Sequence, residues 1–247
     1  MKQFTISKKM RRFLLLLILA AAAAAVLTID VSIKQGVDGR VREIHMPLYA
    51  KGAEFLTRHL EYIRLAKDVT AGCSTDEQKV LAILKWTREN IKEIPPGMPV
   101  IDDHILNIII RGYGVQEQFQ DVFTTLCAYS GVPAFWGRVY GEDRKVKYTL
   151  SFVTLDKKLR VFDAYYGKYF RNKEGKIASV EDISGDHSIV SGGDVDSIFI
   201  KGVPYKTFYY NLDQIEEQMK FRTQKQMPLR RILFEFGKIF DGKKEKR

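Results

Sequence analysis

The chain has 247 residues, of which 45% are hydrophobic, so it can bury one full core but has no room for a second large domain. Its formal net charge is +10, and the basic residues are concentrated in residues 1–12 and 220–247. The body between these ends is close to neutral, which excludes the basic surface of a nucleic-acid-binding protein and predicts no nucleic-acid partner.

Residues 13–29 form an uncharged apolar run directly after the basic residues 1–12. This order predicts a single-pass transmembrane anchor at 13–29 and a basic tail on the cytoplasmic side of the inner (cytoplasmic) membrane. The rest of the chain would then lie on the periplasmic or extracytoplasmic side. A cleaved signal peptide is the alternative, because Ala23 and Ala25 match the small residues of a cleavage site.

Residues 30–70 are predicted to form a connector followed by a helix at about 53–67. A second helix is expected at 74–91, where Ser74 and Glu77 have the spacing of a capping box. Prolines and a glycine at 95–99 break the chain before a short apolar helix at about 103–110.

A further helix is expected to begin near Gln116, because the next apolar residues recur at spacings that mark one buried face. These residues are Phe119, Val122, Phe123 and Leu126. Strands are expected at 134–140, 147–154 and 159–165, forming an antiparallel sheet against this helix. The fold class is therefore α+β. Residues 185–202 are expected to form a mobile loop with a short strand at 198–200.

The segments 74–91, 112–134 and 148–167 resemble, in order and spacing, the core of the transglutaminase-like superfamily, a group related to the papain-like cysteine proteases. The first is similar to the family's leading helix. The second is similar to its nucleophile helix and the Gly-Ile-Pro-Ala sequence that follows, here Gly131-Val-Pro-Ala134. The third looks like its histidine and aspartate strands. The resemblance implies a transglutaminase-like domain at 71–211, with the helix packed on the antiparallel sheet.

The resemblance implies that the family's cysteine, histidine and aspartate fall on Gln116, Tyr148 and Asp163. A shift of one residue would move the second position to Lys147 or Thr149. A glutamine amide neither ionises nor attacks a carbonyl, and a tyrosine is a poor general base at neutral pH. Asp163 would then have nothing left to orient. We therefore interpret the domain as a pseudoenzyme without catalytic residues.

The alternative is a working enzyme: a cysteine-type amidase, protease or transglutaminase using Cys127 or Cys73, or a hydrolase using Asp163. Cys127 falls beside the apolar face of the helix, which favours a buried structural cysteine. The two cysteines of an exported domain are also candidates for a disulfide. The four histidines have no metal-ligand spacing, so neither a metal nor a cofactor is expected.

Aromatic side chains are expected near the cleft that the resemblance implies. They are Tyr113, Trp136, Tyr140, Tyr165 and Tyr166. Such rings can stack on a glycan or anchor a peptide or protein partner, although at least one of the neighbours Phe135 and Trp136 should fill the core. With the anchor, they predict a non-catalytic binding or scaffold subunit of a cell-envelope assembly, and polysaccharide export or synthesis is the fold-level analogy.

Residues 212–247 are expected to form a basic amphipathic helix and tail, with the helix at about 227–242. Its apolar stripe comprises Leu229, Ile232, Leu233, Phe236, Ile239 and Phe240. The helix either packs on its own domain, or lies on the membrane or docks on a membrane partner.

Overall fold

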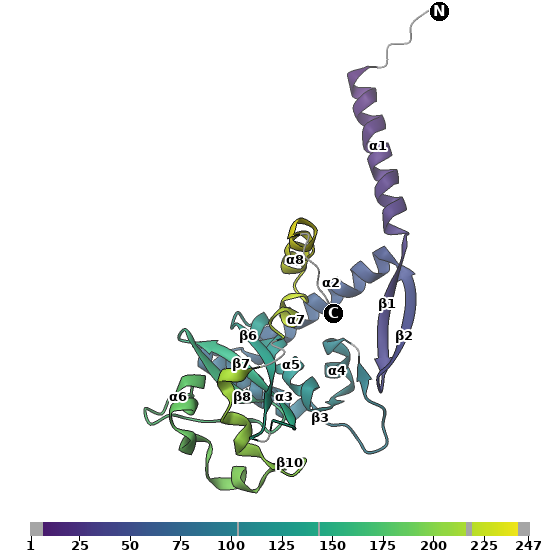
Figure 1. Ribbon diagram of the computed structural model, residues 1–247. Helices are drawn as coiled ribbons and strands as arrows, with labels where there is room; N and C mark the ends of the chain where they lie inside the picture. Colours follow the sequence, from purple (N-terminus) through teal and green to yellow (C-terminus); the bar gives the residue numbers. More distant parts are fainter. Residues whose placement is uncertain (1–6, 103, 143, 216–218, 242–247) are drawn as a thin grey trace, which may run out of the picture.

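The structure is a computed structural model that describes residues 7–102, 104–142, 144–215 and 219–241 (Figure 1). Helix α1 (Lys8–Leu27) projects away from a mixed α+β body and buries none of its residues. Ser7 is its N-cap residue, and the Ser7 hydroxyl accepts a hydrogen bond from the N–H of Met10. The helix therefore includes basic residues that precede the predicted span. Among the described residues it is the one helix long and apolar enough to cross a membrane, with a mean hydropathy of 2.1.

A β-hairpin follows α1, where a connector was predicted, so that prediction was wrong. Strands β1 (Asp30–Val37) and β2 (Arg40–Pro47) pair antiparallel over their full length. Asp38 and Gly39 join them, both with positive φ (48° and 77°), which is the two-residue turn that matches the twist of paired strands. Strand β4 (Ile101–Asp102) pairs with the turn end of β1 and ties the hairpin to the body.

Helices α2, α3 and α4 pack on the central helix of the body, α5 (Gln116–Tyr129), and α2 also contacts the hairpin (Figure 1). Their bounds are Leu48–Val69, Asp76–Asn90 and Ile105–Arg111. Helix α3 starts with a capping box, but its members are Thr75 and Gln78 and not the predicted Ser74 and Glu77. Thr75 is the N-cap residue, so the third helical residue is Gln78, and Glu77 instead pairs with Arg171, with 3.3 Å between Oε1 and Nη1.

The centre of the body is helix α5 (Gln116–Tyr129) against a four-stranded antiparallel sheet in the order β6-β7-β8-β9. These strands are Ala134–Tyr140, Lys147–Leu155, Lys158–Asp163 and Lys168–Tyr169. The apolar side chains predicted for the buried face of α5 are all fully buried, which confirms that prediction. Strands β3 (Lys92–Glu93) and β5 (Tyr113–Gly114) pair in parallel just before α5 begins.

Both faces of this sheet are covered. One face packs on α5 through side chains such as Phe162, which lies 5.5 Å from Phe123 between ring centroids. The other face is covered by residues 178–215, including helix α6 (Val180–Gly185) and the 3-10 turn Tyr205–Tyr209. The segment 185–202 holds 3-10 turns, and β10 (Phe199–Ile200) pairs with β11 (Val203–Pro204) where a short strand was predicted. Its mobility stays a prediction.

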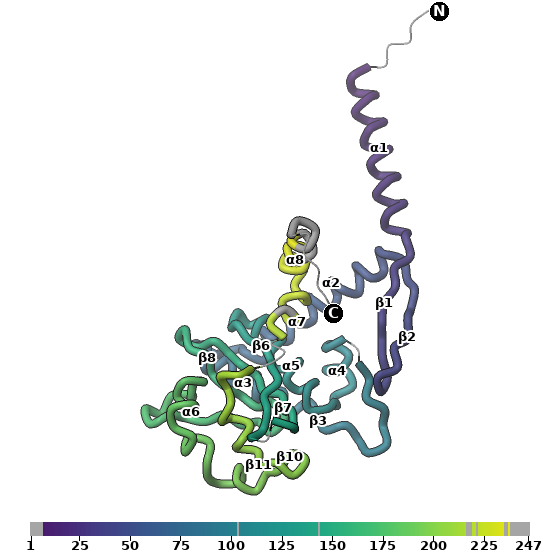
Figure 2. Tube along the Cα trace, in the orientation of Figure 1, coloured from purple at the N-terminus to yellow at the C-terminus, as the bar shows by residue number. Residues whose placement is uncertain are grey.

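The chain then returns to the side of the body on which α1 and α2 lie, as the tube in Figure 2 shows. Helix α7 (Lys220–Gln224) packs on α5 and β6, and α8 (Pro228–Asp241) follows it. The predicted C-terminal helix is confirmed, with Pro228 in its first turn, where a missing N–H costs nothing.

Candidate functional site

The three predicted triad positions sit on the elements expected of them. Gln116 is the first residue of α5, Tyr148 is near the start of β7, and Asp163 ends β8. The entry to α5 is tight: a Cβ at Gly114 would lie 2.7 Å from Oε1 of Gln118, which accepts the backbone N–H of Val115. A side chain at position 114 would therefore displace the cap of α5.

Asp163 is the centre of this site, and its side chain is 0% exposed. Its Oδ2 accepts hydrogen bonds from the hydroxyls of Tyr148 and Tyr205, both at 2.7 Å. Its Oδ1 accepts from Nε2 of Gln120 at 3.1 Å and from the backbone N–H groups of Tyr165 and Tyr166 at 2.8 and 3.2 Å. Both carboxylate oxygens are thus bound by groups of the protein itself.

The expectation that Asp163 has nothing to orient was therefore wrong, because it holds Tyr148, the residue predicted to occupy the histidine position. Burial raises the pKa of Asp163, and the hydrogen bonds from Tyr205 and Tyr148 oppose that rise. Burial and the neighbouring Asp163 also raise the pKa of Tyr148. The tyrosine hydroxyl therefore stays protonated at neutral pH and acts as a hydrogen-bond donor, not as a base.

Gln116 lies beside this network without binding its carboxylate. Its Nε2 donates to the backbone carbonyl of Thr149, the residue after Tyr148. Gln120, one helical turn further, makes the contact with Asp163 and is fully buried. Its Oε1 also accepts from Oγ of Ser151 at 2.6 Å and from the N–H of Ala164 at 3.1 Å.

Sequence reasoning missed Gln120, Tyr205 and Tyr209. The hydroxyls of Tyr205 and Tyr209 lie 2.6 Å apart, and both residues are fully buried. The signal for Gln120 was a polar residue directly after the buried Phe119. The tyrosines had no comparable signal, since both lie in a 3-10 turn on the far face of the sheet, from which Tyr205 reaches Asp163 and Tyr209 binds Tyr205.

The two cysteines differ in their surroundings. Cys127 is fully buried, which confirms the structural interpretation, and burial raises the pKa of its thiol. Cys73 is half-buried at the end of the turn that precedes α3. Both cysteines are free, so the structure contradicts the disulfide that was considered between them.

The aromatic candidates do not form one surface. Trp136 is only 3% exposed, and its Nε1 donates to Oδ1 of Asp121 at 2.6 Å, so it supports the core and is wrong as a binding candidate. Its neighbour Phe135 is buried as well. Alternation along β6 predicted one outward ring, but both are inside because both faces of the sheet are covered.

Tyr165 and Tyr166 are the two candidates that the structure brings together. Their ring centroids are 4.9 Å apart, and they line a cavity of about 230 Å³ with Arg88, Ile91, Lys92 and Glu93. The other two candidates lie elsewhere under basic side chains: Tyr113 under Arg111 and Tyr140 near Lys147. The pair at 165 and 166 directly follows Ala164, so the cavity adjoins the buried Asp163 site in sequence.

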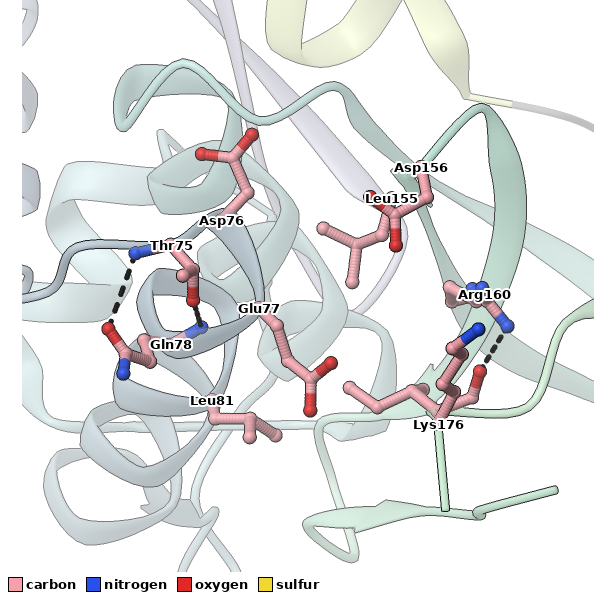
Figure 3. A pocket seen from close by; sticks show the side chains of 10 residues that line it. Thr75, Asp76, Glu77, Gln78, Leu81, Leu155, Asp156, Arg160 and Lys176 are labelled. Carbon is pink, nitrogen blue, oxygen red and sulfur yellow. Dashed lines mark hydrogen bonds between the residues drawn. The ribbon is translucent and has the colours of Figure 1, made fainter. Parts of the chain in front are cut away.

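A larger cavity, of about 540 Å³, lies between the first turn of α3 and the turn that joins β7 to β8 (Figure 3). Its walls carry both signs of charge, with Asp76, Glu77 and Asp156 among the acids. Arg160 is buried at this cavity and donates to the carbonyl of Ile177. Sequence reasoning did not anticipate it.

No group of three or more His, Cys, Asp and Glu side chains in the described part of the chain is placed to hold a metal ion. His59 instead pairs with the hydroxyl of Tyr129 at 2.9 Å, and His187 stacks on Tyr210. The absence of a cofactor stays a prediction.

The family model of the transglutaminase-like superfamily matches residues 63–169. No curated protein matches the chain.

Three solved structures are similar to the chain at low identity. They are a candidate protease of Parabacteroides distasonis ATCC 8503 (16% identity, TM-score 0.35), a candidate cysteine protease of Cytophaga hutchinsonii (20%, 0.39) and a TGase (12%, 0.34). The matches cover 53%, 53% and 66% of this chain, and 35%, 45% and 49% of those structures. The chain thus spans less than half the length of each.

The matched segment contains α3, α5 and strands β6 to β9, the helix and sheet that hold positions 116, 148 and 163. Residues 63–169 therefore form a transglutaminase-like domain.

Proposed function

We propose that this protein is a membrane-anchored, non-catalytic transglutaminase-like domain that serves as a binding or scaffold subunit of a cell-envelope assembly. The observation that supports this most directly is the occupied carboxylate of Asp163, bound by Tyr148, Tyr205 and Gln120. In the intact family site, that carboxylate would orient an imidazole beside a thiol. Here it is part of a buried network of hydroxyl and amide groups.

The alternative, an enzyme with another nucleophile, has less support. Cys127 is buried with a raised thiol pKa, and thiolate is the form that attacks a carbonyl. Asp163 has no free oxygen on which to accept a proton from a substrate. Nucleophilic attack by Cys127 would require the core to open, because this residue is fully buried.

The cavity at Tyr165 and Tyr166 is the binding site that fits this proposal best. It combines two aromatic rings with the basic side chains of Arg88 and Lys92 and one acidic side chain, Glu93. Rings of this kind stack on sugars, and the basic groups suit a carboxylate on a glycan or a peptide. A polysaccharide-related ligand is therefore the first class to test.

Labelling with a thiol-directed probe tests the lack of catalysis. We expect the folded wild-type chain to react no faster than a model thiol, and Cys127→Ala to leave the labelling unchanged, because the Cys127 thiol is buried. Rapid labelling that disappears with Cys127→Ala or Cys73→Ala would instead show a working nucleophile.

The double variant Gln116→Cys/Tyr148→His tests the assignment of the triad positions. A thiol at the first residue of α5 lies at the positive end of the helix dipole, so its pKa should fall below the usual value of about 8.5. The Ser130→Cys variant, at the C-terminal end of the same helix, is the control and should show no such decrease. A thiol that titrates normally at position 116 would place the family's cysteine elsewhere.

The anchor is tested by the mass and location of the chain. We expect the full-length protein in the membrane fraction, retained after alkaline carbonate extraction, because α1 is long enough to span the bilayer. A soluble product that starts near Ala25 would establish a cleaved signal peptide.

A further inference from the structure

The C-terminal helix α8 leaves its apolar side uncovered. Leu229, Ile232 and Leu233 lie on one stripe of the helix, and they are 77%, 51% and 72% exposed. These side chains do not pack on the domain, which argues against that alternative for the helix. Phe236, Ile239 and Phe240 were predicted to belong to the same stripe, but their side chains are not among those that the structure describes.

The body fixes the place at which α8 begins. Just before α7, the N–H of Met219 donates to the carbonyl of Trp136 at 2.9 Å. Within α7, Arg222 pairs with the buried Asp121, with 2.7 Å between Nη2 and Oδ2. The hydroxyl of Tyr129 then donates to the carbonyl of Gln226 at 2.8 Å. The exposed stripe is therefore held on a defined side of the molecule.

A basic group borders this stripe. Arg230 is exposed on α8, one position after Leu229. Arg230 also lines a cavity of about 300 Å³ together with Lys220 and apolar residues such as Pro133. An apolar stripe with basic side chains beside it complements the surface of a bilayer that contains anionic lipids.

The position of α8 agrees with such a surface. Figures 1 and 2 show α8 on the side of the body from which α1 projects, near the level at which α1 gives way to β1 and β2. The view is nearly along the axis of α8, whereas α1 runs lengthwise across it. A bilayer spanned by α1 would present its headgroups at that level, with α8 lying along its surface.

We propose that α8 lies in the headgroup region of the membrane that α1 spans, with Leu229, Ile232 and Leu233 inserted and Arg230 directed to anionic lipid phosphates. The inference rests on the anchoring proposed above and adds a second membrane contact to it. Apolar side chains of such helices insert by about 5–10 Å. The domain would thereby be held against the bilayer by both ends of the chain.

Quenching by brominated lipids tests this contact in the full-length protein. The Leu233→Trp variant is reconstituted in vesicles made of an equal mixture of phosphatidylcholine and phosphatidylglycerol, brominated near the headgroup end of the acyl chains. The Phe199→Trp variant is the control, because Phe199 is 59% exposed but lies in β10, at the end of the body away from α1 (Figure 1). We expect most of the added emission to be lost for Leu233→Trp and little for Phe199→Trp.

Two further variants separate the apolar from the basic contribution. Adding Leu229→Ser and Ile232→Ser to Leu233→Trp should reduce the quenching without changing the thermal unfolding, because both side chains are exposed. Adding Arg230→Glu should reduce it in the anionic vesicles. Equal quenching of Leu233→Trp in purely phosphatidylcholine vesicles would overturn the assignment of an anionic surface.

The outcomes distinguish this inference from the anchoring. A chain that fails to float with the vesicles overturns the anchoring and the inference together. A chain that floats, but whose Leu233→Trp emission is quenched no more than that of Phe199→Trp, overturns the inference alone. Emission that responds to the protein-to-lipid ratio and not to bromination would assign the stripe to a second copy of the chain.

Discussion

The Asp163→Ala variant is expected to lose about 3–5 kcal/mol of unfolding free energy, because the substitution leaves several buried donors without an acceptor. These donors are the hydroxyls of Tyr148 and Tyr205, the side-chain amide of Gln120 and two backbone N–H groups. Denaturant unfolding of the full chain in detergent, followed by circular dichroism, measures the loss.

Two matched variants make this result interpretable. Asp163→Asn keeps one acceptor oxygen, so its loss should be smaller, about 1–3 kcal/mol. Asp213→Ala removes an exposed carboxylate and should change the stability by no more than about 0.5 kcal/mol. A loss below about 1 kcal/mol for Asp163→Ala would contradict the buried network.

The second large effect is expected at Gln120, where leucine should cost about 2–4 kcal/mol. Leucine has a similar size but cannot accept from Ser151 and Ala164 or donate to Asp163. The same substitution one turn earlier, Gln116→Leu, removes a single hydrogen bond from a half-buried side chain and should cost about 1 kcal/mol. The difference between the two unfolding free energies is the measurement. Equal losses would mean that the hydrogen bonds of Gln120 contribute no more to stability than the single hydrogen bond of Gln116.

The elements that could be predicted are those whose pattern is local. The buried face of α5 and the strands β6 to β8 follow from apolar spacing within each segment, and their bounds agree with the prediction to within a few residues. The β1–β2 hairpin had a local signal too, the Asp38-Gly39 turn between alternating residues, but a connector was predicted instead.

The site was less predictable because its partners come from distant parts of the chain. Tyr205 contacts Asp163 across 42 residues, and no spacing in the sequence indicates that a 3-10 turn covers the far face of the sheet. The same covering buries Phe135, whereas Trp136 lies on the opposite face of β6, where its Nε1 donates to Asp121 of α5. An alternating strand predicts one outward face only when that face meets solvent.

The joint between α1 and the hairpin limits how the protein can move. Only Thr28 and Ile29 separate the helix from β1, and both are bound: the N–H of Thr28 donates to Ala24, and the carbonyl of Ile29 accepts from Leu48. A change in the tilt of α1 would therefore move the hairpin with it. Its far tip pairs with β4 at Ile101, so a displacement of the hairpin would reach the domain through this pairing.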